Sequence, residues 1–131
     1  MYKHVLCILS FALLMISGCQ ESLDTSKEED STIHFSVYGT VFDSSGYPVN
    51  GAQISLYEGL HFQGGGTCIG SYVSGLDGQY KIPCSVVREK NVKYSHFYQL
   101  EVHCSGYQEY SESLTIMETE GLEMQVDVKL K

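Results

Sequence analysis

Apolar and polar residues divide the chain into three consecutive parts. Residues 5–16 (VLCILSFALLMI) form an apolar run that only Ser10 interrupts, and residues 20–32 (QESLDTSKEEDST) are almost entirely polar. From residue 33 onward, apolar residues recur at every second position within short segments, which is the pattern of β-strands with one buried face. The pattern therefore predicts an apolar leader, a polar linker and one folded domain.

The first 19 residues have the organisation of an export signal. One cation, Lys3, precedes the apolar run, which is shorter than the roughly 20 residues of a spanning helix and typical of a secretory signal. Two small residues then precede a cysteine in Ile16-Ser17-Gly18-Cys19. This stretch resembles the lipobox of bacterial lipoproteins, in which the cysteine is diacylated and becomes the new N-terminus. The resemblance implies that residues 1–18 are a signal peptide and that Cys19 is the lipidation site. A plain secretory signal or an uncleaved anchor are the alternatives.

Residues 19–32 are predicted to form a lipidated, flexible, acidic tether. Residues 20–32 contain five acidic residues and one lysine, a composition that buries too little apolar surface to fold. The acidic cluster at residues 27–30 resembles the export signals of Bacteroidota surface lipoproteins. The protein is expected in the cell envelope, anchored by lipid at the outer membrane. The sequence does not distinguish the periplasmic face from the surface face.

Residues 33–131 are predicted to form one all-β domain. Seven segments alternate or are bounded by turn residues, and they cover residues 34–42, 52–58, 68–74, 79–83, 97–105, 108–116 and 122–130. Asp77-Gly78 predicts a tight hairpin between the third and fourth segments. Seven short strands without helical periodicity indicate an antiparallel β-sandwich.

The order of strands and turns also carries a resemblance. Residues 37–52 (VYGTVFDSSGYPVNGA), 74–80 (SGLDGQY) and 98–107 (YQLEVHCSGY) look like the successive motifs of carboxypeptidase regulatory-like domains. The resemblance implies a transthyretin-like sandwich of seven strands. It also implies a role in stability or contacts rather than catalysis.

Charge excludes one class of partner. The chain has 8 Lys and Arg against 16 Asp and Glu, a net charge of −8, and it has no basic stripe. Nucleic-acid binding is therefore not expected.

Motifs for catalysis or metal binding are incomplete. Residues 65–71 (GGTCIGS) imitate the glycine spacing of a phosphate loop but lack its lysine. The sequence contains no Gly-x-Ser-x-Gly motif, and His103 and Cys104 are neighbours in a strand, where they face opposite sides. We therefore predict no catalytic, cofactor-binding or metal-binding residue, and no cofactor.

The histidines and cysteines lack the close pairs of a zinc site. His34, His61, His96 and His103 form no His-x-x-x-His pair, and the sequence contains no Cys-x-x-Cys. His61, His96 and Cys68 are the one combination that converging loops could bring together.

Three cysteines fall in the domain, and they are candidates for a disulfide or for buried thiols. In a hairpin centred on Asp77-Gly78, Cys84 faces Ser71, so a Cys68–Cys84 bridge requires a bulge. Cys84 and Cys104 share the parity of apolar neighbours and should point inward, which leaves a Cys84–Cys104 bridge open.

The expected function is that of a lipid-anchored, non-catalytic binding or scaffolding module. Its partner would be an envelope protein or a glycan, contacted in part by aromatic side chains at loops and outward positions: Tyr47, Tyr57, Tyr72, Tyr94, Phe97, Tyr107 and Tyr110. The alternative is a small lipoprotein that is the substrate or partner of a radical-SAM maturation system. A hydrolase that uses His61 or His96 is the third hypothesis.

Overall fold

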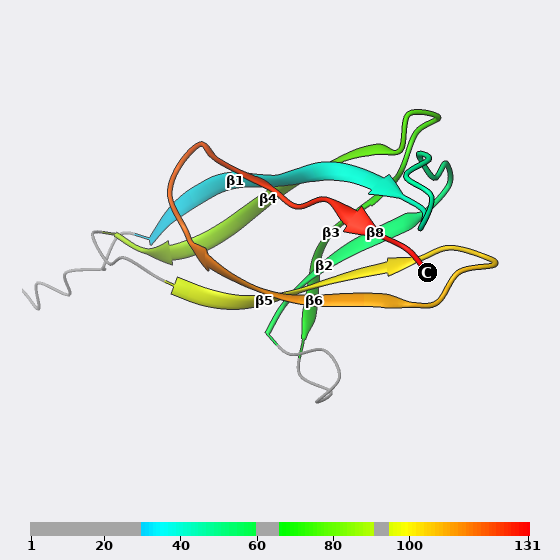
Figure 1. Ribbon diagram of the computed structural model, residues 1–131. Helices are drawn as coiled ribbons and strands as arrows, with labels where there is room; N and C mark the ends of the chain where they lie inside the picture. Colours follow the sequence, from blue (N-terminus) through cyan, green and yellow to red (C-terminus); the bar gives the residue numbers. More distant parts are fainter. Residues whose placement is uncertain (1–29, 60–65, 91–94) are drawn as a thin grey trace, which may run out of the picture.

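Eight β-strands make up the regular structure of the described chain. The computed structural model describes residues 30–59, 66–90 and 95–131, so Cys19, His61 and Tyr94 lie outside the described residues. The strands are β1 (Asp30–Phe42), β2 (Gln53–Glu58), β3 (Thr67–Val73), β4 (Gln79–Glu89), β5 (Ser95–His103), β6 (Tyr110–Met117), β7 (Leu122–Gln125) and β8 (Val128–Lys129) (Figure 1). Within the described residues, no helix has the length and apolar character needed to cross a membrane.

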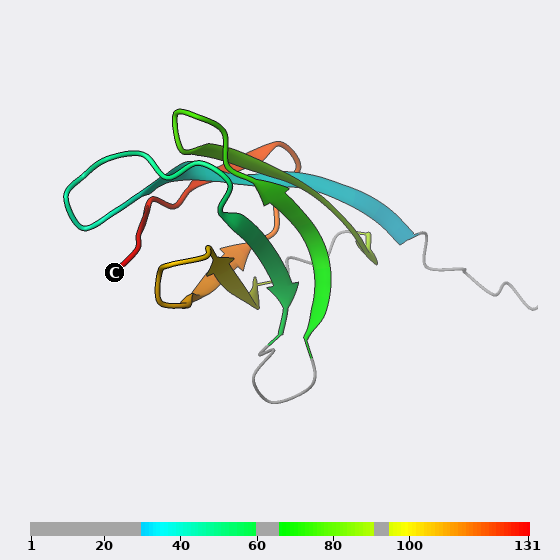
Figure 2. The ribbon, with the colours of Figure 1, turned by 90° about the vertical axis from the view of Figure 1, so that its right-hand side faces the viewer.

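The strands form two sheets that face each other. One has the order β4-β1-β7, with β8 also paired to β1, and the other has the order β3-β2-β5-β6 (Figure 2). The prediction of an all-β sandwich is thus confirmed. Two details of the prediction were wrong. The described strands number eight rather than seven, and the sandwich is not wholly antiparallel, because β7 and β8 both pair with β1 in parallel.

The final predicted strand is divided where it crosses Gly39. A Cβ atom at Gly39 would lie 1.9 Å from the carbonyl oxygen of Val126, so only glycine permits this approach. Beyond it, the carboxylate of Asp127 accepts a hydrogen bond of 2.9 Å from the backbone N–H of Thr40. A side chain thereby takes the place of a backbone partner, and the strand is interrupted between β7 and β8.

The predicted hairpin at Asp77-Gly78 is a turn between sheets. β3 pairs with β2 and β4 pairs with β1, so Cys84 lies opposite Phe35 rather than Ser71. Gly78 has a φ of 71° and packs against β1, where its carbonyl accepts a 2.8 Å hydrogen bond from the N–H of Val41. The Asp-Gly signal correctly marked a chain reversal, but a local turn does not determine which strands pair.

β1 and β4 are longer than expected. Asp30 pairs with Glu89 and Ser31 with Arg88. The pairing therefore includes residues 30–32 of the predicted tether and extends β4 to Glu89, beyond the predicted strand at residues 79–83. Backbone pairing between two antiparallel strands does not require apolar side chains, and the ladder therefore continues past the apolar pattern. The extension carries Arg88 to one end of the sandwich.

The core lies between the sheets and contains the apolar residues that the alternation placed inward. Phe35 of β1 and Tyr98 of β5 meet across it edge to face, with ring centres 5.8 Å apart. The other large, fully buried apolar side chains are Val37, Val41, Ile54, Leu56, Ile82, Leu100, Val102, Ile116, Val128 and Leu130.

Candidate functional site

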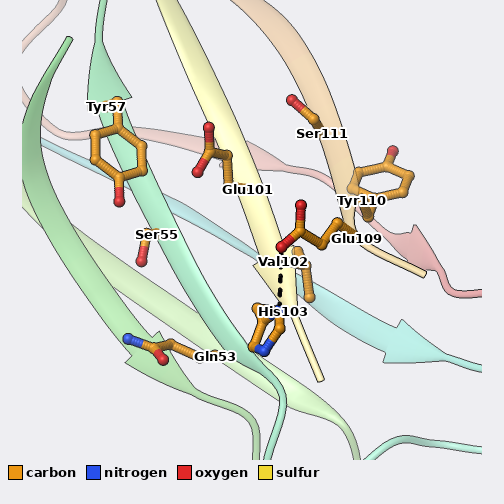
Figure 3. Close-up of a pocket in the computed structure, with 9 residues that line it drawn as sticks. All are labelled: Gln53, Ser55, Tyr57, Glu101, Val102, His103, Glu109, Tyr110 and Ser111. Carbon is orange, nitrogen blue, oxygen red and sulfur yellow. Dashed lines mark ion pairs between the residues drawn. The ribbon is translucent and has the colours of Figure 1, made fainter. Parts of the chain in front are cut away.

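A groove crosses the outward face of the sheet that contains β2, β5 and β6. Its volume is about 590 Å³. The register places Gln53 opposite His103 and Ser55 opposite Glu101. Because side chains alternate along a strand, these outward positions gather on one surface (Figure 3). The lining residues are Gln53, Ser55, Tyr57, Glu101, Val102, His103, Glu109, Tyr110 and Ser111.

An imidazole and a carboxylate meet at one side of the groove. Nδ1 of His103 lies 3.6 Å from Oε1 of Glu109, and the two side chains are 69% and 84% exposed. Figure 3 shows Glu101 beside this pair, on the same strand as His103. Exposed pairs of this kind contribute little to stability, so these groups can interact with a ligand at low structural cost.

A buried amide fixes one hydroxyl group of the groove. Gln99, outward on β5 but only 2% exposed, donates from Nε2 to the hydroxyl oxygen of Ser111. Its Oε1 accepts a 3.2 Å hydrogen bond from Ser113. Because the Ser111 oxygen accepts from the amide, its proton remains to be donated toward the groove.

A second polar cluster closes one end of the sandwich. Nε and Nη2 of Arg88 bind the two oxygens of Glu118 at 2.7 and 2.8 Å. Nη2 also lies 2.5 Å from Oε1 of Glu58 and 2.9 Å from Nδ1 of His96. Arg88 belongs to one sheet, while Glu58 and His96 belong to the other, so the cluster ties the sheets together.

The buried carboxylate of this cluster is held in its charged form. The Glu118 side chain is fully buried, and burial alone would raise its pKa. Hydrogen bonds from Arg88 and from the hydroxyl of Tyr98 outweigh that effect and lower the pKa of Glu118. Burial and the bond to Glu118 raise the pKa of Tyr98, and the bond to Glu118 raises that of Arg88.

This cluster was not predicted from the sequence. Each member of the cluster lies at or beyond the end of an alternating segment, at a position that keeps the inward-facing parity of that segment. The four members are Glu58, Arg88, His96 and Glu118. Parity could have indicated that these side chains face inward, but it does not indicate which strand ends lie close together. His96 lies in β5 beside Glu58, Arg88 and Glu118, whereas Cys68 is exposed on β3 and outside the cluster. Cys68 therefore does not lie with His96, and His61, the third member of the combination considered above, lies outside the described residues.

The three cysteines of the domain are free thiols in the structure. Cys84 is buried, Cys104 is half-buried and Cys68 is exposed. Burial raises the pKa of the Cys84 thiol to about 11, which makes it a poor nucleophile. Neither disulfide considered above is present. For Cys68 and Cys84 the reason is that β3 and β4 lie in different sheets, and that Cys68 is exposed while Cys84 is buried.

The described aromatic side chains singled out in the sequence differ in exposure. Tyr47, Tyr72 and Phe97 are exposed, whereas Tyr57, Tyr107 and Tyr110 are half-buried. Tyr57 and Tyr110 line the groove.

The chain is similar to known proteins in its fold, but its sequence identifies no family. No family model matches the chain, and no curated protein has a matching sequence. Chlorocatechol 1,2-dioxygenase from Pseudomonas putida is similar in structure with a TM-score of 0.56 at 13% identity, over 76% of this chain and 60% of that one. For 3-chlorocatechol 1,2-dioxygenase from Rhodococcus opacus 1CP the TM-score is 0.51 at 10% identity, and the match covers 79% of this chain and 61% of that one. For the Bacillus anthracis TIE protein the TM-score is 0.54 at 16% identity, and the match covers 76% of this chain and 16% of that one.

These similarities correct the predicted function. Two of the structures named above are enzymes, so the inference that this kind of sandwich implies a non-catalytic binding or scaffolding module is wrong. The alternative prediction, a small lipoprotein that is the substrate or partner of a radical-SAM maturation system, is corrected with it. At 10–16% identity the similarity shows the fold alone, and the chain spans about three fifths of the two dioxygenases.

A dioxygenase needs a redox cofactor for its oxygen chemistry, such as flavin, haem, copper or non-haem iron. Within the described residues, one group of metal-ligating side chains lies close together: Glu58, His96 and Glu118, with ligand atoms within 4.8 Å of one another. The guanidinium of Arg88 already lies against all three. These residues therefore do not fit an open, oxygen-binding metal centre.

Proposed function

We propose that the groove over β2, β5 and β6 binds a small, neutral compound that carries hydroxyl groups, and that the chain acts on this compound by acid–base chemistry. The observation that supports the proposal is the convergence of His103, Glu101 and Glu109 with several hydroxyl groups on one groove of about 590 Å³. Concave sites with a few convergent polar groups are where small molecules bind in proteins.

The charge of the groove selects among ligands. Its lining contains two carboxylates and no lysine or arginine, so it favours an entering ligand that is neutral and donates hydrogen bonds. Ionisation of such a ligand in the groove depends on the positive charge that His103 gains with the proton. Ionised carboxylates are strong acceptors for hydroxyl groups, and Tyr57 and Tyr110 offer aromatic surface. An aromatic diol meets both requirements. The two similar dioxygenases named for chlorocatechol support catechols as the first compounds to test.

His103 is the proposed general base. With Nδ1 turned toward Glu109, its Nε2 is left to take a proton from a ligand hydroxyl. Glu109 would then stabilise the imidazolium, because it lies 3.6 Å from Nδ1. Glu101 would accept a hydrogen bond from the second hydroxyl, and Ser111 would donate one to the oxygen that becomes charged.

The test uses 4-nitrocatechol, whose visible absorption changes when it ionises. Titration with the full chain at a pH where the free compound is protonated should shift the spectrum toward the ionised form. His103→Gln should abolish this shift while leaving binding by the other groove residues measurable. 4-Nitroveratrole, in which both hydroxyls are methylated, should not bind.

Thr115→Val provides the matched control. Thr115 is an exposed residue of β6 on the same face of the sheet but outside the groove. This variant should retain the full spectral shift. An unchanged spectrum at saturating protein, or a shift that survives His103→Gln, would contradict the proposal.

We also propose that lipid at Cys19 anchors the domain to the outer membrane of a bacterial envelope. The apolar run, the two small residues before Cys19 and the acidic tether support this proposal. An envelope protein or a glycan is the proposed partner, and a glycan is itself hydroxyl-bearing. The relationship to carboxypeptidase regulatory-like domains is likewise proposed, on the three sequence motifs.

The anchor has a direct test. Cys19→Ala should abolish incorporation of radioactive palmitate and leave an unprocessed precursor. Cys68→Ala is the control, since that cysteine is exposed in the domain and should leave labelling unchanged. Labelling retained in Cys19→Ala would refute lipidation at this residue.

A further inference from the structure

The guanidinium of Arg88 occupies the position of a cation among three metal-ligating atoms. Its Nη2 lies 2.5 Å from Oε1 of Glu58, 2.8 Å from Oε1 of Glu118 and 2.9 Å from Nδ1 of His96. This nitrogen carries two protons, so it makes straight hydrogen bonds to at most two of the three atoms. A metal ion would bond to all of them.

Two of the three distances between these atoms match a metal coordination shell, and all three atoms lie within 4.8 Å of one another. Nδ1 of His96 is 3.1 Å from Oε1 of Glu58 and 3.3 Å from Oε1 of Glu118. Zn²⁺ bonds of about 2.0–2.1 Å at tetrahedral angles place neighbouring ligand atoms about 3.3–3.4 Å apart. His96 could therefore share a metal ion with either carboxylate with little rearrangement. Three protein ligands would leave the fourth position for water.

The cluster also supplies suitable charge and burial. Two carboxylates and an imidazole are favoured ligands of Zn²⁺ and Co²⁺. Glu118 is fully buried, and Glu58 and His96 are each 32% exposed, so an ion could enter from one side. The bonds of Arg88 to Glu118 and Glu58 keep a positive charge in that place.

We propose that Glu58, His96 and Glu118 form a divalent-metal site that Arg88 keeps closed, and that Zn²⁺ or Co²⁺ binds there once the Arg88 side chain is removed. The site shares no residue with the groove, so the proposal is independent of the proposed function. It implies that the unaltered chain needs no metal at this end of the sandwich.

Co²⁺ is the probe, because tetrahedral cobalt has a strong visible absorption band. Titration of the full-length Arg88→Ala protein should produce this band with one equivalent bound. The unaltered protein should produce none at the same cobalt concentration. Adding His96→Ala to Arg88→Ala should weaken cobalt binding by at least about 10-fold, since a direct ligand is lost.

Lys81→Ala is the matched control. Lys81 lies on the same strand and pairs with Glu123 at the surface, so its removal also frees a carboxylate from a cation but should create no cobalt band. If Arg88→Ala unfolds without metal, refolding from urea is compared in Zn²⁺ and in EDTA. Folding only with Zn²⁺ supports the proposal.

Three results would overturn the metal site, and a fourth would overturn its closure by Arg88. The first is a folded Arg88→Ala protein without a cobalt band, and the second is a band that His96→Ala does not weaken. The third is failure of Arg88→Ala to fold in either Zn²⁺ or EDTA. Equal cobalt binding at the cluster of the unaltered protein would refute closure by Arg88.

Discussion

The groove and the Arg88 cluster use the same kinds of side chain, but only the cluster is shielded from water. In the groove, His103 and Glu109 are 69% and 84% exposed and 3.6 Å apart. In the cluster, the side chains of Arg88 and Glu118 are 15% and 0% exposed, and their closest atoms are 2.7 Å apart. The buried pair is committed to the fold, whereas the exposed pair is available to a ligand.

The difference follows from strand parity. Residues of the cluster continue the inward positions of their strands, where the two sheets meet at one end. Residues of the groove occupy mostly outward positions of β2, β5 and β6, where the sheet borders solvent. A polar residue in an alternating strand therefore has a different role according to its parity.

Arg88→Ala should have the largest effect on stability. It removes the charge that pairs with the buried Glu118 and should cost about 3–5 kcal/mol of unfolding free energy. Urea denaturation without added metal measures this loss. Lys81→Ala removes an exposed pair and should cost less than about 1 kcal/mol. Equal losses in the two variants would contradict the distinction between buried and exposed charges.

Acid should weaken the cluster. The pKa of Glu118 is lowered in the folded protein, so the stabilisation is present above the unfolded pKa of about 4.5 and is lost as pH falls through the folded value. The unfolding free energy should therefore decrease below that pH. Thermal denaturation across the acid range should give a flatter profile for Glu118→Gln. An identical profile for this variant would mean that other carboxylates dominate the acid response.

His103→Gln should have the smallest effect on stability. The side chain is exposed and its pairing with Glu109 is long, so the unfolding free energy should change by less than about 0.5 kcal/mol. Urea denaturation beside the unaltered protein measures the change. A loss above about 2 kcal/mol would show that His103 supports the fold and would weaken its assignment to ligand chemistry.

The alternation of apolar residues predicted most of the fold. It located the strands and correctly predicted that residues such as Ile54, Leu100 and Val128 face the core. It did not predict that β3 and β4 lie in different sheets, because the Asp77-Gly78 turn specifies a local reversal and not a partner strand. The interruption at Asp127 was equally hidden, since it depends on contact with Thr40, far away in the sequence.

The two polar regions could be predicted only in part. The outward positions of His103 and Glu101 follow from parity, but their convergence with Ser55 depends on the pairing of β2 with β5. The cluster combines residues spread between positions 58 and 118, and Arg88 lies beyond the end of the strand predicted at residues 79–83. Tertiary pairing, rather than any local motif, brings these groups together.

Mapping the binding site of 4-nitrocatechol by NMR tests the central claim most directly. With the full chain, the ligand should shift the backbone amide signals of Ser55, Glu101 and Ser111, which belong to three neighbouring strands of the groove. The amide signals of Glu58, Arg88 and Glu118 should stay in place. Shifts centred on the Arg88 cluster, or no shifts at saturating ligand, would contradict the assignment of function to the groove.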